Sequence, residues 1–62
     1  MKETDKEVLL RILCECGWII KKHSYDNTIY TMEDNWLGDR LDIEFSSEGS
    51  VLSITVEQEH NN

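Results

Sequence analysis

Two stretches near the end of the chain alternate apolar and polar residues with a period of two, and this alternation constrains the fold more than any other feature. Residues 40–45 read RLDIEF and residues 51–57 read VLSITVE. A two-residue turn at Glu48-Gly49 predicts apolar pairs on one face of a hairpin, namely Phe45 with Leu52, Ile43 with Ile54 and Leu41 with Val56. The same register predicts polar pairs on the other face, namely Glu44 with Ser53, Asp42 with Thr55 and Arg40 with Glu57. A shift by one residue would bury carboxylates, so the register is strongly determined.

A helix and a first hairpin are predicted before these strands. Thr4-Asp5-Lys6-Glu7 matches a capping box, apolar residues follow at helical spacing, and Gly17 is placed for a left-handed C-terminal cap. We expect a helix over about residues 5–16. Residues 18–23 and 28–32 are expected to pair across a turn rich in Asp and Asn, and the pattern leaves open which face of this hairpin contacts solvent.

These elements predict an α+β fold in which one N-terminal helix packs on a four-stranded antiparallel meander, in the order αββββ. The 62 residues are expected to form a single small acidic domain, residues 1–62, with residues 58–62 frayed. The chain has no apolar run of the roughly 20 residues that span a bilayer and no secretory-signal pattern at its N-terminus, so we expect a cytoplasmic protein. Cys14 and Cys16 do not suit a disulfide framework, and we expect reduced thiols packed in the core.

The net charge of −7 comes entirely from the second half of the chain. Residues 1–31 carry five bases and five acids, whereas residues 32–62 carry one base, Arg40, and eight acids. Such an acidic block repels phosphate and attracts basic surfaces. The sequence therefore predicts association with a cationic protein and argues against direct binding to nucleic acid.

Metal ligands of the right kinds are present, but their spacing does not predict a site. The nitrogen and sulfur candidates are Cys14, Cys16, His23 and His60. Side chains two residues apart on a helix point about 200° apart, and no C-x2-C pair occurs. The acidic stretch also fails the calcium-loop pattern, because Trp36 falls on position three when Asp34 is position one. We predict no bound metal and no cofactor.

Catalytic residue types occur without an arrangement that predicts catalysis. Asp42 and Glu44 could exchange protons only in a pocket that shifts the pKa of one of them, and a chain this small can hardly form both a core and a cleft. His23, Ser24 and Asp26 cluster on one turn, which is not the geometry of a catalytic triad. We therefore predict that the protein is not an enzyme.

Trp36 lies among acids in the stretch EDNWLGDRLDIE, in a polar connection that contains Gly38. One interpretation is that Trp36 and Leu37 fold back to close the end of the core. The other is that Trp36 anchors a partner protein while the acids steer it. The sequence leaves both open.

The predicted function is that of a small inhibitor or adaptor without catalytic activity. It would dock on a basic surface of a partner, such as a nucleic-acid-binding protein or nuclease complex, through seven residues: Glu33, Asp34, Trp36, Asp39, Asp42, Glu44 and Glu48. In size, charge and αβ composition the chain resembles the small acidic inhibitors that phages carry against host nucleases and defence systems, including nucleic-acid mimics and anti-CRISPR proteins. That resemblance implies a host cytoplasm as the site of action. The alternative is a structural or regulatory module that forms a homodimer through residues 18–32.

Overall fold

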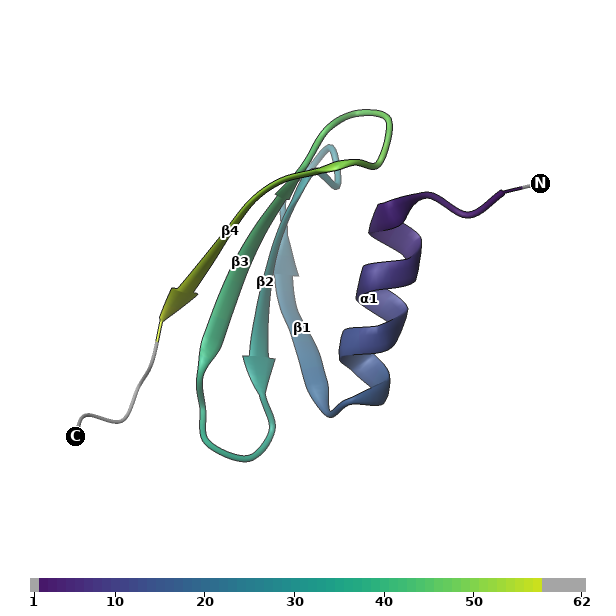
Figure 1. The fold of residues 1–62 in the computed structure, drawn as a ribbon. Helices are drawn as coiled ribbons and strands as arrows, with labels where there is room; N and C mark the ends of the chain where they lie inside the picture. The colour runs from purple at the N-terminus through teal and green to yellow at the C-terminus, as the bar shows by residue number, and fades with distance from the viewer. Residues whose placement is uncertain (1, 58–62) are drawn as a thin grey trace.

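A computed structural model describes residues 2–57 and contains one helix and one sheet (Figure 1). The helix α1 spans Asp5–Glu15, and the strands are β1 (Trp18–His23), β2 (Ile29–Asp34), β3 (Arg40–Phe45) and β4 (Val51–Glu57). The strands pair antiparallel in the order β1-β2-β3-β4. This arrangement confirms the predicted αββββ meander. The prediction that residues 58–62 fray lies outside the described residues.

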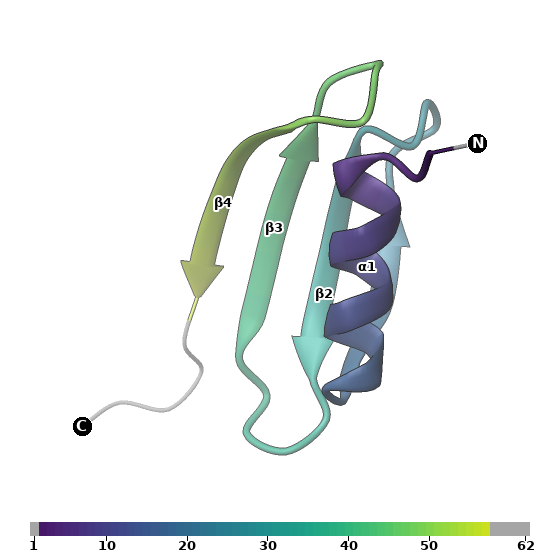
Figure 2. The same cartoon turned by 45° about the vertical axis from the view of Figure 1, so that its right-hand side comes forward.

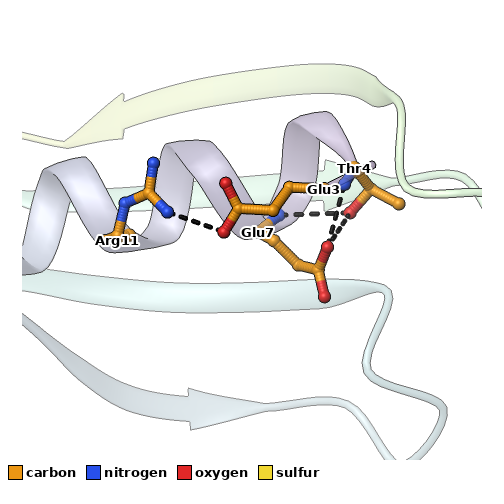
Figure 3. A network of polar contacts seen from close by, with 4 residues as sticks. All are labelled: Glu3, Thr4, Glu7 and Arg11. Atoms are coloured by element: carbon orange, nitrogen blue, oxygen red, sulfur yellow. Dashed lines mark hydrogen bonds and ion pairs between the residues drawn. The ribbon is translucent and has the colours of Figure 1, made fainter. Parts of the chain in front are cut away.

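The start of α1 is the predicted capping box (Figure 3). The Thr4 hydroxyl accepts a hydrogen bond from the Glu7 backbone N–H at 3.2 Å, and the Glu7 carboxylate accepts one from the Thr4 N–H at 2.8 Å. Two backbone donors that a helix leaves unsatisfied are thereby satisfied. The helix ends at Glu15, and Gly17 takes the left-handed conformation expected of it, with φ of +102°.

The buried core comprises Tyr30 and Met32 from β2 and Ile43 and Phe45 from β3. Partly buried residues surround it, namely Leu9, Leu10 and Leu13 of α1 with Trp18 and Leu41. The Tyr30 and Phe45 rings meet edge to face at 5.8 Å between centroids, a favourable geometry for aromatic pairs. The face of the first hairpin that carries Tyr30 and Met32 is therefore the one turned toward the helix.

The last hairpin has the predicted register along most of its length. Leu41 opposes Val56, Ile43 opposes Ile54, and the three polar pairs of the other face are also as predicted. The predicted pair of Phe45 with Leu52 is wrong, because the register shifts after Glu44 and Phe45 opposes Val51.

The cause of this shift is the β3–β4 turn, which is longer than the predicted two residues. The Gly49 N–H donates to the Ser46 carbonyl at 3.0 Å, and the Ser46 hydroxyl accepts from the N–H groups of Glu48 and Ser50 at 3.2 and 3.0 Å. Gly49 has φ of +90°. A longer loop that ends on a left-handed glycine commonly introduces a bulge into a hairpin.

The first turn of α1 contacts both turns at one end of the sheet. The Lys6 N–H donates to the Gly49 carbonyl at 2.9 Å, and the Lys6 ammonium donates to the Asn27 carbonyl at 2.8 Å. The same ammonium lies 5.3 Å from the centroid of the Tyr30 ring. These contacts fix the start of the helix against the β1–β2 and β3–β4 turns.

The helix covers only part of the sheet. Figure 2 shows α1 in front of β1 and β2, while β3 and β4 lie to one side of it. Ile54 and Val56 oppose buried or partly buried residues of β3 and share their face, yet they are 51% and 59% exposed. All seven residues of β4 are exposed. The part of the apolar face that β4 contributes is therefore uncovered.

Candidate functional site

The β2–β3 loop holds Trp36 at the end of the sheet where α1 meets β1. The Asp34 backbone closes the loop, because its N–H donates to the Asp39 carbonyl at 2.8 Å and its carbonyl accepts from the Gly38 N–H at 3.2 Å. The Asp34 carboxylate accepts from the Trp36 N–H at 2.9 Å, which is the pattern of an Asx turn. Gly38 supplies the positive φ, +80°, that the return of the chain requires.

A further backbone contact ties this loop to the turn between α1 and β1. The Asn35 N–H donates to the Gly17 carbonyl at 3.2 Å. The loop is therefore fixed at its base and at one side. A side chain at its tip is presented from a defined backbone position, which lowers the entropy cost of binding.

The side chains at the tip of the loop do not enter the core. Trp36 is 86% exposed and Leu37 is 60% exposed. The interpretation that these residues close the end of the core is wrong. Trp18, which opposes Asp34 across the first hairpin, packs on the core instead. Because burying a tryptophan removes about 150–250 Å² from water, leaving Trp36 exposed forgoes several kcal/mol of stabilisation.

Four of the seven predicted binding residues lie together at this loop: Glu33, Asp34, Trp36 and Asp39. Glu33 precedes the loop on β2, opposes Arg40 on β3, and has its carboxylate 3.5 Å from the Lys21 ammonium. The loop thus combines an exposed indole with carboxylates, and basic groups lie beside Glu33.

Asp42 and Glu44 lie on the face of the sheet opposite α1, as predicted. They alternate on β3 with residues that contact the core, and they oppose Thr55 and Ser53 of β4. Glu44 is exposed, whereas Asp42 is half-buried and accepts a hydrogen bond from the Thr31 hydroxyl at 2.7 Å. Negative charge therefore projects from β3 on this face.

Basic side chains share the outer face with these acids. The Arg40 guanidinium lies 3.8 Å from the Glu57 carboxylate, and the Lys21 ammonium lies beside Glu33. Both ion pairs are solvent-exposed and contribute little to stability. The outer face therefore has an acidic part, at Asp42 and Glu44 of β3, and a part of mixed charge near the β2–β3 loop.

Glu48 is the predicted binding residue that the fold separates from the others. It lies in the β3–β4 turn, at the end of β3 opposite to the Trp36 loop. The six residues of β3 span roughly 20 Å, so Glu48 and Trp36 cannot contact one small epitope. Two exposed apolar features were not assigned to the site from sequence: Leu37 next to Trp36, and the apolar residues of β4. The position of Leu37 in a polar loop could have predicted its exposure from sequence. The exposure of β4 could not be predicted in this way, because it depends on where the helix lies.

The cysteines are free, but the prediction that they pack in the core is wrong. Cys14 and Cys16 are both exposed. Cys16 is the C-cap of α1, where the regular helical spacing ends, and so it does not continue the apolar stripe. Within residues 2–57 no group of three His, Cys, Asp or Glu side chains is placed to hold a metal ion.

The chain matches no protein-family model, no curated protein and no solved structure. In the part that the structure describes, no helix has the length and apolar character needed to cross a membrane.

Proposed function

We propose that this protein is a small, non-catalytic inhibitor or adaptor that docks on a basic, nucleic-acid-binding surface of a partner protein. The observation that carries the proposal is the exposure of Trp36 on a hydrogen-bonded loop whose neighbours are acids. Exposed aromatic residues that bury on contact contribute strongly to binding, and surrounding charges determine orientation and association rate.

The charge of residues 32–57, which include β3 and β4, supports a cationic target. From Met32 to Glu57, Arg40 is the single base against seven acids. Asp42 and Glu44 are two residues apart on one face of β3, which places successive carboxylates roughly 7 Å apart along the strand. A row of negative charge of this kind fits a groove that otherwise binds the phosphates of a nucleic acid. We propose that the protein acts in the cytoplasm, which would be the cytoplasm of the host if a phage encodes the protein.

The first experiment tests the contribution of the Trp36 indole to binding separately from that of the acids. Affinity capture with the full chain, from an extract of the organism in which it acts, should isolate a basic nucleic-acid-binding protein. Trp36→Ala should weaken binding of that purified partner about tenfold or more, because removing an anchor side chain typically costs about 2 kcal/mol or more of binding free energy. Tyr25→Ala is the matched control, since Tyr25 is fully exposed at the opposite end of the sheet.

The second arm tests the charge. Asp42→Lys with Glu44→Lys should weaken binding and reduce its dependence on salt. The control is Glu3→Lys with Glu15→Lys, which changes the net charge by the same amount on and near α1. The captured partner should also release a labelled oligonucleotide when the wild-type protein is added. Equal binding by all variants, or a partner that holds its nucleic acid unchanged, would show that the proposal is wrong.

A further inference from the structure

We infer that β4 pairs with β4 of a second copy, antiparallel about a two-fold axis, to join two sheets into one of eight strands. This inference does not depend on the proposed function, because β4 lies outside the Trp36 loop. β4 is an edge strand of the sheet formed by residues 2–57, so every second residue turns its backbone N–H and C=O away from β3.

The composition of β4 is unusual for an exposed edge. Residues 51–56 read VLSITV, without a charge, a proline or a glycine, and are rich in β-branched residues. Natural proteins protect exposed edges with lysine, with proline or with bulges. The opposite edge, β1, has such protection, because it carries Lys21 and Lys22 and a register shift between Ile20 and Lys22. β4 has no charge before Glu57, and its bulge lies at its first residues.

The small core gives a second reason for a partner at this edge. The fully or nearly fully buried core consists of Tyr30, Met32, Ile43 and Phe45, while four apolar residues of β4 are exposed. A chain of this length has little apolar surface to bury by itself, and oligomerisation is a common remedy. The first hairpin also exposes apolar side chains, namely Ile19, Ile20, Tyr25 and Ile29, but its edge strand β1 carries two lysines and a register shift that oppose pairing with another strand.

The occupant is a second copy because β4 complements itself. A two-fold axis through Ile54 places Ile54 next to its own copy, Val56 next to Leu52, and Ser53 next to Thr55. Apolar residues then meet apolar residues on the helix side, and hydroxyls meet hydroxyls on the outer side. In this register the only charged residue of β4, Glu57, opposes Val51 of the other copy, so no like charges meet along β4.

The test introduces charges that the monomer tolerates and the dimer does not. In Ser53→Lys with Thr55→Lys, the new lysines oppose Glu44 and Asp42 within one chain, which favours the folded monomer. Between copies, position 53 opposes position 55 twice, so two pairs of like charges form. The dissociation constant of the dimer should therefore rise about tenfold. The variant also lowers the net negative charge, which by itself would favour association.

The control is Ser53→Glu with Thr55→Lys, which restores opposite charges between the copies; because its new carboxylate opposes Glu44 within one chain, circular dichroism first checks that the control is folded. Sedimentation equilibrium over a wide concentration range should show wild type rising to twice its 7.3 kDa, the double-lysine variant dissociating, and the control remaining dimeric. Amide hydrogen exchange in β4 should slow with concentration in wild type and in the control. A wild type that stays monomeric throughout, or a dimer that responds identically to both double substitutions, would overturn the inference.

Discussion

Gly49 is a residue at which the β3–β4 turn lies close to Thr4, the N-cap of α1. Its φ is +90°, and a Cβ at this position would lie 2.5 Å from the Thr4 Cβ. Gly49→Ala should therefore destabilise the protein by about 2 kcal/mol or more, because left-handed strain and overpacking each cost about 1–3 kcal/mol. Urea unfolding followed by circular dichroism measures the loss.

Gly17 provides the control for this prediction. It has a similar φ, +102°, but a Cβ there would have no atom within 4 Å. Gly17→Ala should cost only the backbone strain, so its effect on the free energy of unfolding should be the smaller of the two. Equal losses for both variants would mean that contact with Thr4 contributes nothing.

At the scale of the element, the β1–β2 turn is organised by one carboxylate. The Asp26 carboxylate accepts hydrogen bonds from the hydroxyls of Ser24 and Thr28 at 2.8 and 2.7 Å and from the Thr28 N–H at 3.3 Å. The hydrogen bonds from Thr28 and then Ser24 lower the pKa of Asp26 below its usual value of 3.8. A carboxylate whose pKa is lower in the folded chain stabilises the fold above its unfolded pKa, and this contribution disappears as the pH falls through the folded pKa.

Asp26→Asn removes this titration. The variant should be less stable than wild type at neutral pH, and the difference between their free energies of unfolding should shrink as the pH falls below about 4. Urea unfolding of both proteins from neutral to acidic pH gives this difference directly. A difference that keeps its neutral value at acidic pH would show that the charge of Asp26 does not support the turn.

The elements also show what sequence patterns can and cannot predict. The register of Ile43 with Ile54 was predictable, because the alternative buries Asp42 and Glu44. The length of the β3–β4 turn was not, because it depends on hydrogen bonds from two backbone N–H groups to the Ser46 hydroxyl. For the candidate site, the outward position of Asp42 and Glu44 followed from alternation. The exposure of Trp36 was not predictable, because it depends on whether the β2–β3 loop folds over the core, which no local pattern reveals.

At the scale of the whole molecule, the uneven charge should weaken the fold at low ionic strength. Seven acids and one base lie between Met32 and Glu57, and repulsion between exposed charges is screened over about 10 Å at 0.1 M salt. Wild type should therefore unfold at a higher temperature in moderate sodium chloride than in dilute buffer. Thermal unfolding at one protein concentration checks this, since association would also shift the midpoint.

Asp42→Lys with Glu44→Lys should reduce that salt response and remain folded. The substitution removes the hydrogen bond from Thr31 to Asp42, a loss of about 1 kcal/mol, but it also replaces two neighbouring negative charges. If the unfolding temperature of the variant rises with salt as steeply as that of wild type, the acids of β3 are not the source of the repulsion.

The register shift in β1 has a consequence for how large an assembly can become. A sheet whose two edge strands can both pair with another copy can extend into a fibre without limit. Here the pairing of β1 with β2 shifts register between Ile20 and Lys22, and Lys21 and Lys22 lie at this shift. Growth through β4 therefore ends after one addition, and the protein is kept from polymerising by the strand farthest from the one that joins it to its copy.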